Sequence, residues 1–259
     1  MLGGGSQEGG APMSGTRNNT TEDDPKQRLV ALIGEAREEQ LAFIGGLSPL
    51  ERATVGTPER WSPKDLLAHV GAWWGRQGGR FARVACGEHP DTFDWTDAEN
   101  AATFAANRDR PWDAVSAEVA ESYATLLEAV QALSLEDLTD PTRVGAMHGR
   151  PLWRLVVGNG YRHPQTHLAE HYVQRGEIGR ATQLRETMAA ALSRRLPELR
   201  ATELYNLACF YATVGRPADA LAQLGAAVAV EPALREAARQ DHDLDVVRTL
   251  TAFQALVSE

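Results

Sequence analysis

Apolar residues recur at intervals of three and four along most of the chain, which is the spacing of one face of an α-helix. The first such stretch covers residues 26–45. It begins after Asp24 and Pro25, a helix-capping residue followed by a favoured first helical residue, and it ends at Gly45 and Gly46. We find no convincing run of alternating apolar and polar residues typical of a β-strand. The pattern therefore predicts an all-α fold.

Three further long helices are predicted, over residues 62–86, 112–133 and 151–176. The first of them starts with "WSPKD", in which Ser62 is the expected cap, Pro63 the first helical residue and Asp65 the partner that completes a capping-box arrangement. Between the helices we expect a polar connector containing Trp95 and Asn100, and a loop over "LEDLTDPTRVGAMHGR". Four long helices joined by moderate loops predict a four-helix bundle.

Pro164 lies inside the last of these helices. A proline removes one backbone N–H, and its ring presses on the carbonyl four residues earlier. That residue is Gly160, and Gly158 lies nearby, so a local kink is easily accommodated. We expect the kink to turn His163 into the bundle. The alternative is a helix that starts at Pro164 and leaves His163 in a loop.

The character of the chain changes at about residue 181. An amphipathic helix, "TQLRETMAAALSRRL", precedes a segment that matches the tetratricopeptide (TPR) pattern of large and small residues. The matching residues are Leu204, Leu207, Ala208, Tyr211, Ala220, Leu224 and Pro232. A single repeat cannot bury both of its faces, so the preceding helix and the tail over residues 233–256 are expected to cover it.

These patterns divide the chain into three parts. Residues 1–25 are rich in Gly, Ser, Thr and Asn and are predicted to be a disordered tail. Residues 26–180 are predicted to form the four-helix bundle, and residues 181–259 a TPR-like helical module.

The charge balance narrows the classes of partner. The net charge is −9 and there is no block of Lys and Arg, which argues against nucleic acid or an anionic membrane as the main partner. No apolar run approaches the roughly 18–20 residues of a membrane span, and no secretory signal is visible, so we expect a cytoplasmic protein. Cys86 and Cys209 form neither a disulfide framework nor a thiolate metal site.

Three of the seven histidines, His163, His167 and His171, lie at steps of four on one helix. Neighbouring members of this stripe can direct their rings at one point. The outer two are about 12 Å apart along the helix axis and cannot share one small ion. The stripe therefore offers one chelating pair, either His163 with His167 or His167 with His171.

A third ligand is found on the second predicted helix. His69 lies in an apolar stretch between Leu66 and Val70, where a lone histidine is ordinarily a hydrogen-bonded core residue. Together with a histidine pair on the fourth helix, however, it can converge on one point in the core of a bundle. Three neutral imidazoles leave a divalent ion at least one open position, and in the absence of thiolates Zn²⁺, Ni²⁺ or Fe²⁺ would suit the site.

The segments "WSPKDLLAHVGAW" and "NGYRHPQTH" resemble the DinB/YfiT-like four-helix-bundle superfamily, and within it the ClbS/DfsB-like branch. The resemblance covers residues 26–176 and implies one histidine on the second helix and a His-x-x-x-His pair on the fourth. One spacing of that pattern matches Asn159, Tyr161, His163 and His167. A looser spacing matches His167, His171 and Gln174. We prefer His163 with His167 and keep His171 as the alternative ligand.

The resemblance also implies a class of function. Many members of the superfamily are thiol-dependent transferases or hydrolases, and others have lost the metal. A metal-dependent enzyme acting on a thiol or another reactive small molecule, as in detoxification, is therefore one hypothesis. The other is a non-catalytic adaptor whose TPR-like module binds a protein partner or a second copy of the chain.

Four residues are candidate helpers for such chemistry. Glu170 is a candidate general base, and Trp73, Trp74 and Tyr161 are candidate pocket walls. The ordinary expectation is that Glu170 lies on the surface and that one tryptophan belongs to the core and the other to the rim. We find no Ser-His-Asp set, phosphate-binding loop or dinucleotide fingerprint.

Overall fold

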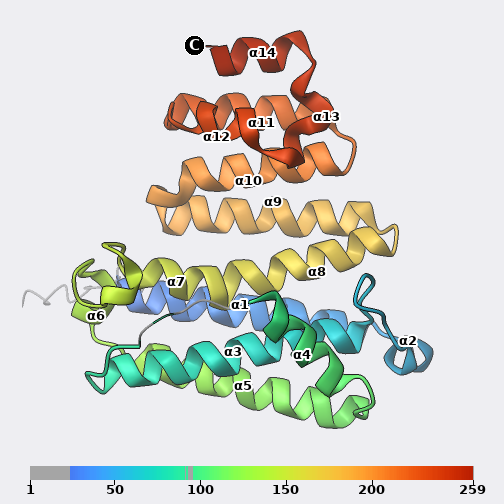
Figure 1. Cartoon of the computed structure of the whole chain (residues 1–259), viewed down its shortest axis with the longest axis vertical. Helices are drawn as coiled ribbons and strands as arrows, with labels where there is room; N and C mark the ends of the chain where they lie inside the picture. The colour runs from blue at the N-terminus through green and yellow to red at the C-terminus, as the bar shows by residue number, and fades with distance from the viewer. Residues whose placement is uncertain (1–23, 91, 93–95, 259) are drawn as a thin grey trace, which may run out of the picture.

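The structure is a computed structural model that describes residues 24–90, 92 and 96–258. Four long helical segments form a bundle (Figure 1): α1 (Pro25–Gly45), α3 (Pro63–Ala85), α5 (Trp112–Ala132) and a fourth segment that runs from α7 (Trp153–Val157) to α8 (His163–Gln174). The short helices α2 (Pro49–Ala53) and α6 (Leu135–Thr139) lie in the connections. Apart from an isolated bridge between Thr57 and Arg60, these described ranges contain no strand pairing. The predicted all-α fold is confirmed.

The predicted helix starts are confirmed by their hydrogen bonds. The Asp65 carboxylate accepts from the backbone N–H of Ser62 at 2.8 Å and from its hydroxyl at 2.6 Å. Asp24 accepts from the backbone N–H of Lys26 at 2.9 Å and thereby caps α1. The predicted disordered tail lies outside the described residues up to residue 23, and its last two residues belong to the start of α1.

The connector after α3 contains a helix that sequence reasoning missed. Where we expected a polar connector, α4 (Asp97–Asn107) forms, and Trp95 of that connector lies outside the described residues. Its start is a capping box in which Glu99 accepts from the backbone N–H of Thr96 at 2.8 Å, and an ion pair with Arg76 ties Glu99 to α3. The Thr-x-x-Glu spacing at residues 96–99 was the available signal.

The fourth bundle segment changes its winding before the histidines. Between α7 and α8 lies a π-helical turn, η2 (Gly158–Arg162), and α8 begins at His163, so the alternative start at Pro164 is wrong. The wider turn accommodates a proline that cannot donate to the preceding carbonyls. It also brings Gly160 against α1, since a Cβ on Gly160 would lie 2.8 Å from Cγ1 of Ile33.

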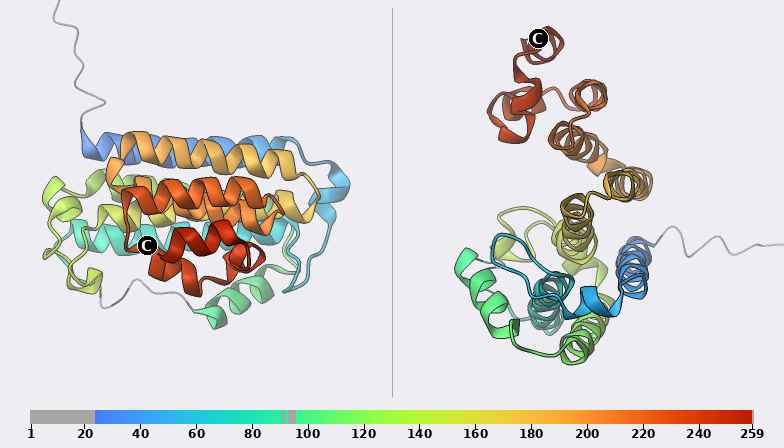
Figure 2. Two further views of the ribbon diagram at one scale, coloured as in Figure 1. Left: turned by 90° about the horizontal axis from the view of Figure 1, so that it is seen from above. Right: turned by 90° about the vertical axis from the view of Figure 1, so that its right-hand side faces the viewer.

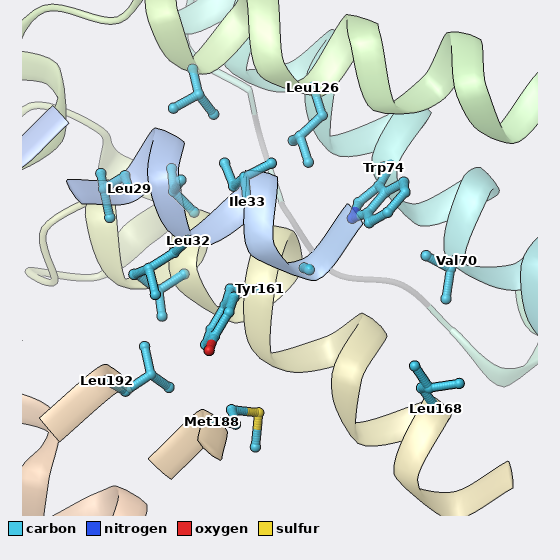
Figure 3. Packing of buried hydrophobic residues seen from close by; sticks show 14 of the residues in the cluster. Leu29, Leu32, Ile33, Val70, Trp74, Leu126, Tyr161, Leu168, Met188 and Leu192 are labelled. Carbon is cyan, nitrogen blue, oxygen red and sulfur yellow. The ribbon is translucent and has the colours of Figure 1, made fainter. Parts of the chain in front are cut away.

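The main hydrophobic core extends beyond the four bundle helices. Helix α9 (Ile178–Arg195) packs against α8, and Met188 and Leu192 face the same interior as Leu32 and Tyr161 (Figure 3). Arg195 also forms an ion pair with Glu35 of α1. The predicted division of the chain at residue 180 stays a prediction, but the helix that follows that division closes the core of the bundle.

The remaining helices form a column that leads away from the bundle (Figure 2). They are α10 (Arg200–Thr213), α11 (Pro217–Val230), α12 (Leu234–Gln240), α13 (Asp245–Arg248) and α14 (Thr251–Ser258). Helices α10 and α11 pair where the repeat pattern predicted two helices, and Leu207 and Leu224 are buried between them. Val247 and Phe253 of the tail join this second core, so the tail covers the pair as expected.

An ion pair with one buried member joins the two parts. Glu203 of α10 is fully buried and pairs with Arg162 of the π-helical turn. Nearby, Arg185 of α9 donates to the Thr166 hydroxyl of α8 at 2.7 Å. Within the described ranges, none of the helices combines the length and the apolar character that crossing a bilayer requires.

Candidate metal centre

Three histidines from two helices meet in the bundle. The Nε2 atom of His163 lies 3.1 Å from Nε2 of His69 on α3 and 3.1 Å from Nε2 of His167, one turn further along α8. One ligand atom from each of the three rings lies within 4.8 Å of the other two. The two helices pack against each other at this level, so the group is fixed by the bundle itself.

The spacing of these nitrogens fits a metal ion. Two imidazole nitrogens on a tetrahedral Zn²⁺ lie about 3.3 Å apart, because each Zn–N bond is about 2.0–2.1 Å long. The 3.1 Å separations in the triad are close to that value. His69, His163 and His167 therefore form a group that could hold a divalent ion.

Glu170 determines which nitrogen of His167 carries the proton. Its Oε2 lies 2.8 Å from Nδ1 of His167, and because a carboxylate only accepts, Nδ1 is the donor. In the neutral ring the lone pair of Nε2 then points into the triad. A carboxylate behind the outer nitrogen is the usual arrangement around a metal-binding histidine.

Protons alone do not satisfy the triad. When Nε2 of His167 carries only a lone pair, Nε2 of His163 can act as a donor or as an acceptor, but not as both. A hydrogen bond can therefore form in only one of the two 3.1 Å pairs. The Nδ1 atoms of His69 and His163 are also buried without a hydrogen-bond partner among the described residues. A cation that accepts all three Nε2 lone pairs removes the conflict among the Nε2 atoms and leaves the ring protons on the Nδ1 atoms.

Burial keeps two of the rings neutral. Loss of water around the ring, followed by the proximity of His167, lowers the pKa of His69 to about 3. The same causes, with His69 as a further neighbour, lower the pKa of His163 to about 2. Both imidazoles are therefore unprotonated near neutral pH, as a metal ligand must be.

The sequence pattern of the DinB superfamily matches residues 27–175, more than half of the chain. The chain belongs to the DinB superfamily. The match covers the four bundle segments and the three histidines and stops before α9. Proteins of this superfamily often bind metal. No curated protein and no solved structure matches the chain.

In this DinB-superfamily protein, two tryptophans flank the triad. The ring centre of Trp73 lies 4.4 Å from that of His163, which places it as the wall that the sequence suggested. Trp61, which sequence reasoning missed, lies 4.6 Å from the ring of His69 and 5.7 Å from that of His167. Its only signal was an apolar residue directly before the cap of α3.

The other two aromatic candidates belong to the core. Trp74 is fully buried and lies edge-on to Tyr123, with the ring centres 5.6 Å apart. Tyr161 is 1% exposed and lies beside the α9 residues Met188 and Leu192 (Figure 3), and burial raises its pKa to about 12. The expected split between a core and a rim tryptophan is confirmed, whereas Tyr161 is a packing residue.

The structure separates His171 from the triad. Its ring is 7% exposed and lies edge-on to Phe43 of α1, with the ring centres 5.4 Å apart. Burial, assisted by the charge of Arg175, lowers its pKa to about 4. Of the two pairs that the sequence left open, His163 and His167 are the pair that meets His69.

A second polar group lies outside the bundle. Cys209 of α10 comes together with Asp241 and Asp243, and the Tyr205 hydroxyl donates to Asp241 at 2.9 Å. Burial and the two carboxylates raise the pKa of the Cys209 thiol far above its usual value. Without a metal ion, the thiol therefore stays protonated.

Proposed function

We propose that the chain binds one divalent metal ion through His69, His163 and His167 and uses it to transform a reactive small molecule. The observation that carries the proposal is the convergence of three Nε2 atoms from two packed helices, with 3.1 Å between neighbours. The reaction we propose is a thiol-dependent transfer or a hydrolysis, in keeping with the resemblance of "WSPKDLLAHVGAW" and "NGYRHPQTH" to the ClbS/DfsB-like branch.

The donor set favours a borderline ion. Three neutral nitrogens without a thiolate suit Zn²⁺, Ni²⁺ or Fe²⁺. When bound, such an ion supplies Lewis-acid chemistry at an open position, where it lowers the pKa of a water or thiol.

The residues around the triad have distinct roles in this proposal. Glu170 holds the Nδ1 proton of His167 and keeps its Nε2 lone pair directed inward. This contact makes Glu170 an orienting residue and not the general base considered from the sequence. Trp61 and Trp73 cover the histidine rings and exclude water from their faces.

The metal content of protein purified without a histidine tag tests the proposal. We expect about one ion per chain in the wild type and its loss in His69→Ala and His167→Ala. His171→Ala is the matched control, because it removes a buried ring from the same helix without touching the triad. Stoichiometric metal in both triad variants would refute the site.

A substrate screen tests the chemistry separately. Protein reconstituted with Zn²⁺, Ni²⁺ or Fe²⁺ would be incubated with an electrophilic small molecule, with and without a low-molecular-weight thiol. We expect turnover that disappears in His167→Ala and persists in His242→Ala, which changes an exposed histidine of the C-terminal region. Bound metal with no turnover in any combination would leave a metal-binding protein and remove the enzyme proposal.

A further inference from the structure

A pocket of about 570 Å³ lies at the end of the bundle, where the segment between α2 and α3 meets the last turn of α8. Its outer wall is a well-defined turn. The backbone groups of Thr57 and Arg60 are hydrogen-bonded in both directions, at 2.9 and 3.1 Å. Gly56 lies so close to the capping carboxylate of Asp65 that any Cβ would collide with it. The wall is therefore anchored to the start of α3.

A polar group with unused hydrogen-bonding capacity lines this pocket. His171 is among the lining residues, and only 7% of its surface is exposed. Its Nε2 has no hydrogen-bond partner within the described ranges of the chain. A buried polar atom without a partner is unfavourable, and native proteins rarely keep one without a reason. The metal centre does not explain it, because His171 is not part of the triad.

The charged residues that line the pocket, Glu51, Arg60, Arg175 and Glu177, balance in number, but both carboxylates pair with Arg175 and none with Arg60 among the described residues. Arg175 is paired with Glu51 at 2.6 Å and with Glu177 at 2.5 Å. Arg60 is exposed and lines the same pocket, and its guanidinium donates only to the backbone carbonyl of Gln174 at 3.4 Å among the described residues. A carboxylate entering the pocket would find a guanidinium that pairs with no carboxylate among the described residues and that keeps further N–H donors beside the one given to Gln174.

Trp61 supplies the apolar wall of the pocket. The same indole contacts the rings of His69 and His167, so one aromatic side chain separates the pocket from the triad. Val55 and Pro63 add further apolar surface beside it. An aromatic or aliphatic body therefore has a surface on which to lie.

We propose that this pocket binds a small organic acid, with its carboxylate on Arg60, its apolar body against Trp61 and a polar group hydrogen-bonded to His171. The site goes beyond the proposed metal chemistry and does not require the ion. The pocket volume lies within the range of small-molecule sites, which is about 300–1,000 Å³.

Binding of 3-phenylpropionate to metal-free full-length protein tests this proposal, with 3-phenylpropylamine as the matched probe of opposite charge. By calorimetry or ligand-observed NMR we expect the acid to bind with a dissociation constant of about 1 mM and the amine not to bind. Arg60→Gln should weaken acid binding about tenfold, and Arg60→Glu should reverse the preference toward the amine.

Two further variants separate the pocket from the overall charge and from the metal centre. Arg83→Gln removes another exposed arginine, on the far end of α3, and should leave binding unchanged. His171→Phe should weaken binding at least threefold while a thermal melt shows it folded. Absence of acid binding by the wild type, or equal binding by Arg60→Glu, would overturn the proposal. Either result would leave the metal analysis of His69→Ala unaffected.

Discussion

The two hydrophobic cores of the molecule are built from different side chains. The core of the bundle and α9 contains large buried residues such as Trp74, Phe81 and Tyr161. The core of α10–α14 has a larger share of alanine, including Ala208 and Ala220, which let paired helices approach closely, alongside the rings of Tyr205, Tyr211 and Phe253. The histidine triad lies in the first region, whereas the second holds the group of Cys209, Asp241 and Asp243, in which the Tyr205 hydroxyl and the Cys209 thiol donate to Asp241. The comparison places the candidate metal centre in the region of the first core.

The largest effect is expected from cutting the chain on either side of α9. A fragment that ends at residue 180 loses the α9 residues that close the bundle core, and we expect it to aggregate. A fragment that ends at residue 199 keeps them and should remain soluble and folded. Size-exclusion chromatography and thermal melting followed by circular dichroism distinguish the two. If the shorter fragment were equally stable and soluble, α9 would belong to the C-terminal region alone.

The ion pair between the two regions should give the next largest effect. In Glu203→Ala, Arg162 loses a fully buried partner but is itself 25% exposed and stays partly solvated, so we expect a loss of about 1–3 kcal/mol in the free energy of unfolding. The double variant Arg162→Met/Glu203→Leu replaces both charges by apolar groups and should recover most of that loss. Urea unfolding measures both. A double variant as unstable as the single one would show that the pair itself stabilises the junction.

Acid should destabilise the bundle through its buried histidines. An unfolded histidine has a pKa of about 6.5, whereas folding lowers the pKa of His69 to about 3 and that of His163 to about 2. Below about pH 6.5 the unfolded chain therefore binds protons that the folded chain does not, so stability falls with pH toward the folded pKa values. Thermal melts of metal-free protein between about pH 7 and 5 measure this fall.

Single histidine variants assign that acid sensitivity to one of the two regions. His163→Gln should flatten the pH dependence, whereas His242→Gln in the C-terminal region should not, because the His242 side chain is 94% exposed. An unchanged slope in His163→Gln would show that the acid sensitivity arises elsewhere.

The smallest effect is expected at the partner of His167. Glu170 is exposed, so Glu170→Gln should leave the melting temperature nearly unchanged. It weakens the contact that directs Nε2 inward, and changes of this kind lower metal affinity about 10- to 100-fold. A competition titration with a metal-binding dye measures the shift. Equal affinity in the variant would remove the orienting role of Glu170.

Local patterns predicted most of the bundle. Apolar periodicity and caps such as Ser62 with Asp65 located the four long segments, because these signals act within a few residues of the chain. The pair His163 and His167 followed from helical spacing on α8, and His69 from its position in an apolar stretch of the second long helix; the resemblance implied the same set. The structure brings those three together and leaves His171 apart.

Features that depend on distant contacts were not predictable in the same way. Trp61 lies outside the helical period of α3, so nothing in the spacing showed that it faces His69. Glu203 is the single acidic residue of α10, and its partner Arg162 lies 41 residues earlier. Pro164 predicted a distortion, but its form as a π-helical turn depends on the fit of Gly160 against Ile33 of α1.

The π-helical turn determines the direction in which the side chains after it point around the helix axis. Such a turn holds about one residue more than an α-helical turn, and one residue corresponds to about 100° of rotation about the axis. Residues before Gly158 and after Arg162 therefore do not share one helical wheel. This offset directs His163 and His167 toward His69. Deleting one residue from the turn would therefore rotate both imidazole rings away from His69, although neither histidine is itself substituted.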